Sequence, residues 1–213
     1  MLHYRSRLLL LVLFAIAMAL VEAAVVAYLR ALYYPEGFTV ILKEISRQHL
    51  MIEIGREFAT IVMLATVAGL AGRERWERFG WFVMLFGVWD IFYYFWLKIT
   101  IDWPLAWNDW DILFLIPAPW VGPVIAPVLV SLLMIFVGIS LTRLYKRKIR
   151  FRPTVTTWVT ALIATGMILY SFLRDAGRVT RGEHPEPYWY SALILGLGLY
   201  LFAYWWSYRQ ADE

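Results

Sequence analysis

Long apolar blocks constrain this chain more than any other feature of its sequence. Hydrophobic residues make up 62% of the 213 residues, and only 17% are charged. A transmembrane helix needs about 20 mostly apolar residues to cross the hydrocarbon of a bilayer. The sequence therefore predicts an all-α, polytopic membrane protein, with residues 1–213 forming a single integral membrane domain. The six predicted transmembrane helices cover residues 8–32, 49–71, 80–100, 121–144, 154–174 and 188–208.

Lysine and arginine are distributed unequally between the segments that join these spans. Twelve lie near the ends of the chain and in the links at 72–79 and 143–152, and six lie in the links on the other side. The positive-inside rule then predicts cytoplasmic N- and C-termini and a location in the inner (cytoplasmic) membrane. Basic runs can also bind anionic lipid or nucleic acid. We interpret the run at 146–152 as a topology anchor.

The segment before the fourth span has an unusual composition. Residues 101–127 hold five of the nine prolines, and Pro117, Pro119, Pro123 and Pro127 exclude one regular helix there. Non-helical backbone at membrane depth is tolerated only where it is buried in protein or lines a wet cavity. The sequence thus predicts a Pro-rich re-entrant or capping segment. Its aspartates, Asp102, Asp109 and Asp111, could extend an acidic mouth or bind a cation. We interpret them as solvated side chains, with Asp109 or Asp111 capping a short helix.

Ionisable residues inside the predicted spans are the main functional signal, because charges at membrane depth are costly and usually mark a site. Glu22, Glu57 and Asp90 lie on three consecutive spans. At 1.5 Å per residue, each lies about 13–15 Å below the outer end of its helix. Three carboxylates at one level predict a shared site.

The second span carries a polar stripe. His49, Glu53 and Glu57 follow a spacing of four residues, which places them on one face of a helix. Arg56 lies on the same part of the helix and can pair with Glu53 or with carboxylates of the neighbouring spans. This stripe would descend from the outer surface into the membrane.

The third span carries a second stripe at the same spacing, formed by Asp90, Tyr94 and Lys98. If the two stripes face one another, they line a polar cleft that opens to the outside. The candidate ligand-binding or ion-binding residues are therefore Glu22, Glu53, Arg56, Glu57, Asp90, Tyr94 and Lys98.

The charges of this cleft do not balance. Four carboxylates against two basic residues leave a formal surplus of two negative charges, which demands protons, a metal ion or a cationic ligand. A divalent metal is an open alternative, with His49, Glu53, Glu57 and Asp90 as its candidate ligands. The sequence has no Glu-x-x-His or HExxH pattern, so the cofactor is unknown.

Three functions remain open at this point. The leading hypothesis is an integral membrane protein whose outward-facing carboxylate and arginine cleft binds or conducts a proton, a metal cation or a small polar solute. The second is a membrane-embedded enzyme, with or without a metal, that acts on a lipid or quinone-like substrate. The third is a non-catalytic subunit of a larger membrane complex. The expected partners are membrane lipids, with a homo-oligomer or a larger complex as further options and no nucleic acid.

Overall fold

The architecture is mostly helical. The computed structural model describes residues 3–43, 45–149 and 151–211. The long helices are α1 (Tyr4–Tyr33), α2 (Arg47–Ala71), α3 (Arg75–Ile101), α4 (Ile125–Lys146), α5 (Val155–Leu173) and α7 (Tyr190–Ala211). The short elements are β1 (Trp110–Phe114), β2 (Trp120–Pro123) and α6 (Ala176–Thr180). Six helical segments are long and apolar enough to cross a membrane, which confirms the predicted class of integral membrane protein.

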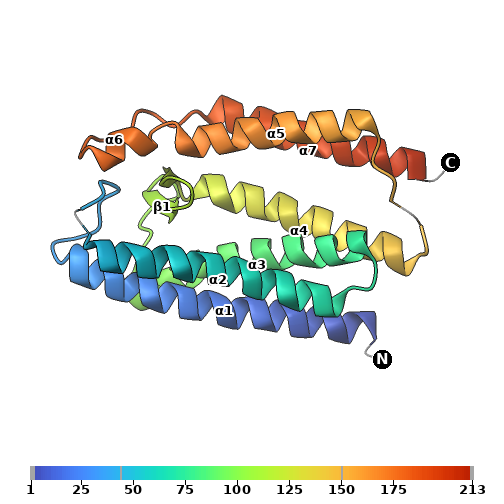
Figure 1. The fold of residues 1–213 in the computed structure, drawn as a ribbon, viewed down its shortest axis with the longest axis horizontal. Helices are drawn as coiled ribbons and strands as arrows, with labels where there is room; N and C mark the ends of the chain where they lie inside the picture. The colour runs from blue at the N-terminus through green and yellow to red at the C-terminus, as the bar shows by residue number, and fades with distance from the viewer. Residues whose placement is uncertain (1–2, 44, 150, 212–213) are drawn as a thin grey trace.

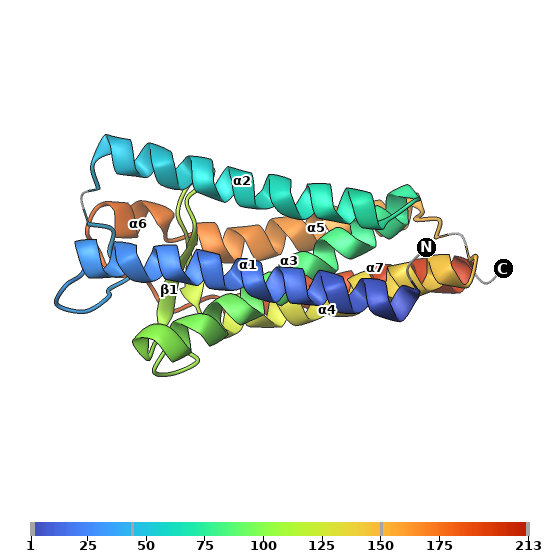
Figure 2. The ribbon, with the colours of Figure 1, turned by 90° about the horizontal axis from the view of Figure 1, so that it is seen from below.

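The helices run roughly along one long axis (Figures 1 and 2). α3 packs against α1, α2 and α4, while α5 and α7 form a pair on the other side of α4 (Figure 1). The N- and C-terminal ends of the described chain lie at one end of the bundle, and β1 and α6 lie toward the other end. The two ends of the bundle therefore differ in structure.

Small residues on α1 let it lie close to α3. A stripe of every fourth residue on α1 is buried, and it faces large buried side chains of α3. The α1 stripe consists of Leu11, Ala15, Ala19 and Ala23. Its short side chains leave room for bulky residues of the partner helix, such as Trp81 and Met84. In a membrane, where lipid is as apolar as the protein, close packing of this kind is a main source of helix association.

Glycines allow an even closer approach between α3 and α4. A Cβ atom on Gly138 would lie 2.5 Å from the carbonyl oxygen of Gly80, and one on Gly87 would lie 2.5 Å from that of Ser131. Both distances are too short for real carbon–oxygen contacts. The crossing of these two helices therefore depends on glycine.

The Pro-rich segment folds as an antiparallel hairpin of β1 and β2, with Trp110 opposite Pro123 and Asp111 opposite Gly122. The all-α prediction thus needs two short strands added. The fourth helix begins at Ile125, later than predicted, because residues 121–123 belong to β2. Pro127 lies in the first turn of α4, where backbone N–H groups have no intrahelical acceptor. The lack of an N–H in proline therefore costs no helical hydrogen bond there.

The glycine crossing gives a direct test of the fold. We predict that Gly138→Ala destabilises the protein by about 1–3 kcal/mol, because the added methyl group overpacks the contact between α3 and α4. Gly166→Ala is the matched control, since a Cβ atom there meets nothing within 4 Å. It should be neutral or slightly stabilising, because alanine favours helix over glycine. Unfolding in detergent measures both, and equal stability of the two variants would contradict the packing described here.

Candidate functional site

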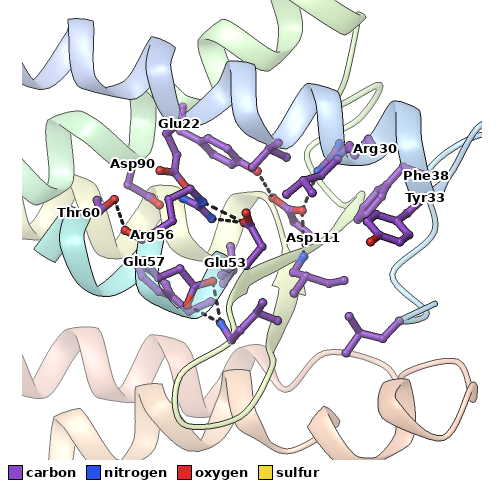
Figure 3. Close-up of a pocket in the computed structure, with 18 of the residues that line it drawn as sticks. Glu22, Arg30, Tyr33, Phe38, Glu53, Arg56, Glu57, Thr60, Asp90 and Asp111 are labelled. Carbon is purple, nitrogen blue, oxygen red and sulfur yellow. Dashed lines mark hydrogen bonds and ion pairs between the residues drawn. The ribbon is translucent and has the colours of Figure 1, made fainter. Parts of the chain in front are cut away.

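An acidic cavity of about 120 Å³ lies among α1, α2, α3 and the hairpin (Figure 3). Its charged lining residues are Glu22, Arg30, Glu53, Arg56, Glu57, Asp90 and Asp111. Five carboxylates thus face two arginines, a formal surplus of three negative charges if all are ionised. The structure brings carboxylates of three consecutive helices to one cavity, since Glu22 lies on α1, Glu57 on α2 and Asp90 on α3.

Arg56 organises one side of the cavity. Its Nη2 lies 2.8 Å from Oε2 of Glu53 on the same helix, and its Nη1 donates to Oε1 of Glu22 on α1. Figure 3 shows these three side chains converging. The hydroxyl of Thr60 donates to the Arg56 carbonyl oxygen at 3.0 Å. Arg56 therefore joins α1 to α2, and its two carboxylate partners share its single positive charge.

Glu57 contacts the hairpin instead of a basic residue. Both of its carboxylate oxygens lie 3.0 Å from the backbone nitrogen of Leu115, which donates from the loop between β1 and β2. Glu57 is buried, and no ion pair between described residues includes it. It therefore holds the loop of the hairpin against α2 while its own charge stays uncompensated.

Asp90 has a neutral partner as well. The hydroxyl of Ser131 on α4 donates to Oδ2 of Asp90 at 2.8 Å. The two arginines of the cavity have other partners: Arg56 pairs with Glu22 and Glu53, and Arg30 pairs with Asp111. Within the described part of the chain, Asp90 takes part in no ion pair. Asp90 and Glu57 are thus the two lining carboxylates that have no basic partner.

A buried ion pair forms the opposite side of the cavity. Nη2 of Arg30 lies 2.8 Å from Oδ1 of Asp111, and only 8% and 1% of the two side chains are exposed. The Arg30 guanidinium lies over the rings of Phe38 and Trp103, 3.8 Å and 3.7 Å from their centroids, and these two rings contact each other edge to face. Such stacking stabilises a desolvated cation. The interpretation of Asp111 as a solvated or capping residue was therefore wrong.

The environment of Asp111 sets its protonation. Burial raises the pKa of Asp111, and the adjacent Arg30 guanidinium opposes this by lowering it. The backbone N–H of Ile112 also favours the ionised form, donating to Oδ1 at 2.9 Å. The hydroxyl of Tyr93 approaches the other oxygen at 3.5 Å. Burial has the largest effect on the pKa of Asp111, and Arg30 is the main group that opposes it.

Arg30 also borders a second hollow. This open hollow of about 980 Å³ lies between the end of α1 and the segment that follows α3. Arg30, Tyr34 and Phe38 line both hollows, so the two hollows are neighbours.

The remaining candidate residues lie in different places. Tyr94 lines the cavity and is buried. Lys98 does not line it: the ammonium pairs with Asp102 at 2.7 Å and is about half exposed. The predicted stripe therefore does not include Lys98 in the cavity. Side chains at positions i, i+4 and i+8 shift progressively around the helix axis, because a turn has 3.6 residues and not four. His49 is hydrogen-bonded to the hydroxyl of Tyr33 and is likewise not among the lining residues.

The candidate metal ligands do not converge. Among the described residues, no group of three or more His, Asp or Glu side chains is arranged to hold a metal ion. His49, Glu53, Glu57 and Asp90 each have a different partner, namely Tyr33, Arg56, Leu115 and Ser131. These four candidate ligands therefore do not form a shared metal site in the part of the chain that the structure describes.

The Arg30–Asp111 pair yields a pH-dependent prediction. In Arg30→Met the pKa of Asp111 rises further, since the group that lowers it is gone, while the unfolded chain keeps the ordinary pKa. The folded state then retains a proton that the unfolded state loses, so stability falls as pH rises between these two pKa values. We expect a loss of about 3–5 kcal/mol above the higher pKa and a smaller loss in acid.

Unfolding of the variant in detergent across a pH series measures this. The double variant Arg30→Met/Asp111→Asn is the control, because it removes the guanidinium together with the carboxylate charge that would otherwise be buried without a partner. It should recover much of the stability and lose the pH dependence. A loss that is equal in both variants and constant with pH would show that the ion pair has no such role.

The chain has no match in three comparisons: no family model, no curated protein and no solved structure matches it. The assignment of function therefore depends on the geometry of the site.

Proposed function

We propose that the protein binds a small organic cation of the ammonium type in the acidic cavity, with Glu57 and Asp90 as its counter-charges. One observation carries the proposal. The cavity has a formal surplus of three negative charges, and these two carboxylates line it without a basic partner among the described residues. Uncompensated charges at membrane depth are costly, so they must take up protons or bind a cation.

The rest of the lining supports an organic cation over a bare ion. Ammonium groups bind well over the faces of aromatic rings. The aromatic lining residues are Tyr33, Tyr34, Phe38, Trp89, Tyr93, Tyr94 and Phe114. Arg30, whose guanidinium lies over the rings of Phe38 and Trp103, is an example of such binding at the edge of the same cavity.

The size of the cavity limits the ligand. A volume of about 120 Å³ compares with roughly 30 Å³ for one water molecule in the liquid. The cavity therefore accommodates a few water molecules or a solute of a few heavy atoms. A small ammonium ion fits within this volume, whereas the tail of a lipid or quinone would have to lie outside the cavity.

In this proposal the hairpin is a re-entrant cover of the site. Leu115 contacts Glu57, which lies ten residues into α2, about 15 Å along the helix axis. Backbone at that depth needs a buried acceptor, and the Glu57 carboxylate supplies one. The positive-inside rule, applied to the distribution of lysine and arginine, supports an external position for this end of the bundle. The site would accordingly receive its ligand from the external side.

Calorimetry tests the proposal with methylammonium, dimethylammonium and tetramethylammonium chloride as probes, on the protein in phosphatidylcholine nanodiscs. A cation that replaces protons on the carboxylates binds more tightly as pH rises and releases protons on binding. We predict both effects. Glu57→Gln and Asp90→Asn should each weaken binding by about tenfold or more, because each removes a charged partner worth about 1.5–3 kcal/mol.

Glu36→Gln is the matched control, because Glu36 follows α1 at the same end of the bundle and is exposed, and it does not line the cavity. This variant should bind as the unmodified protein does. Binding that is unchanged in the Glu57→Gln/Asp90→Asn double variant would overturn the proposal, as would the absence of binding for all three probes. The latter result would favour a structural role of these charges within a larger complex.

A further inference from the structure

A basic hollow lies at the end of the bundle opposite the acidic cavity. It has a volume of about 660 Å³ and lies between the link that joins α2 to α3, the end of α4 and the segment that leads to α5. This is the end where the N- and C-terminal ends of the described chain lie (Figure 2). The hollow shares no lining residue with the acidic cavity, so the two sites are independent.

The charge of this hollow is strongly positive. Its charged lining residues are Arg73, Glu74, Lys146, Lys148 and Arg152, a formal surplus of three positive charges. No ion pair between described residues includes either Lys148 or Arg152, and Arg150 lies outside the described residues. The Lys146 ammonium lies over the ring of Tyr4, 5.1 Å from its centroid. A concave surface of one sign concentrates ligands of the opposite sign.

An aromatic cluster borders the same hollow. The ring of Trp76 lies 5.0 Å from Phe151, 5.8 Å from Phe79 and 6.1 Å from Trp158, measured between centroids. Phe79 and Trp158 remain 46% and 53% exposed. Aromatic side chains of this kind are enriched where a membrane helix meets the headgroups of the lipid. The hollow therefore lies at headgroup level and adjoins apolar surface.

We propose that this hollow binds the phosphate-bearing headgroup of an anionic phospholipid. The basic side chains would bind the phosphate, and the acyl chains would lie along the apolar surface next to Trp158 and Val155, which is 80% exposed. A free phosphate would use the charges alone and leave the adjoining aromatic and aliphatic surface without a role. The combination of both surfaces assigns the site to a lipid. Basic pockets between transmembrane helices bind such headgroups in this way.

Native mass spectrometry of the delipidated full-length protein tests this, with phosphatidylglycerol and phosphatidylcholine as the probes. We expect one tightly bound phosphatidylglycerol and at least tenfold weaker binding of phosphatidylcholine. The double variant Lys148→Gln/Arg152→Gln should lose about tenfold or more of the preference. Both side chains are exposed, so the variant should unfold at the same temperature as the unmodified protein when no lipid is present.

Arg143→Gln/Arg147→Gln is the matched control. Arg143 and Arg147 belong to the same basic stretch, and their substitution removes the same amount of positive charge. Both side chains are exposed and do not line the hollow. The control should keep the preference for phosphatidylglycerol. Equal losses in the two double variants would overturn the proposal in favour of diffuse attraction to anionic lipid. Displacement of the lipid by inorganic phosphate at comparable concentration would overturn it in favour of a site for the free anion.

Discussion

Charged side chains are costly at membrane depth, and this constraint governs the structure. The ion pairs between Arg56 and its two glutamates reduce that cost most directly. Arg56 reaches Glu53 on its own helix and Glu22 on α1, so one guanidinium is shared by two carboxylates and joins two helices. Glu57 and Asp90 receive hydrogen bonds but no opposite charge.

The hairpin is a second consequence of the same constraint. Backbone that enters a helical bundle must find acceptors for its N–H groups, because lipid offers none. The loop between β1 and β2 uses Glu57 for this, and β1 brings Asp111 to Arg30. The hairpin thus completes the cavity on two sides. It couples the shape of the cavity to the charge of Glu57, because protonation or ligand binding at that carboxylate changes the acceptor of the Leu115 N–H.

Local properties of the sequence predicted the helices, because a run of about 20 apolar residues needs no information from the rest of the chain. The shared level of Glu22, Glu57 and Asp90 could also be predicted, since depth along a helix follows from residue number alone. Pairing between distant segments could not. Arg30 and Asp111 are 81 residues apart, and nothing near either residue indicates the other. The glycine contacts between α3 and α4 depend likewise on how two helices cross.

The two ends of the bundle have opposite charge, acidic in the cavity beside the hairpin and basic in the hollow beside α4. The proposed function depends most on the acidic cavity, where Glu57 and Asp90 have no basic partner among the described residues. Infrared difference spectroscopy of the protein in lipid, recorded on addition of methylammonium, observes these groups directly. The account predicts loss of the protonated-carboxyl band and no such loss in Glu57→Gln/Asp90→Asn. An unchanged band in the unmodified protein, or an equal change in the double variant, would contradict it.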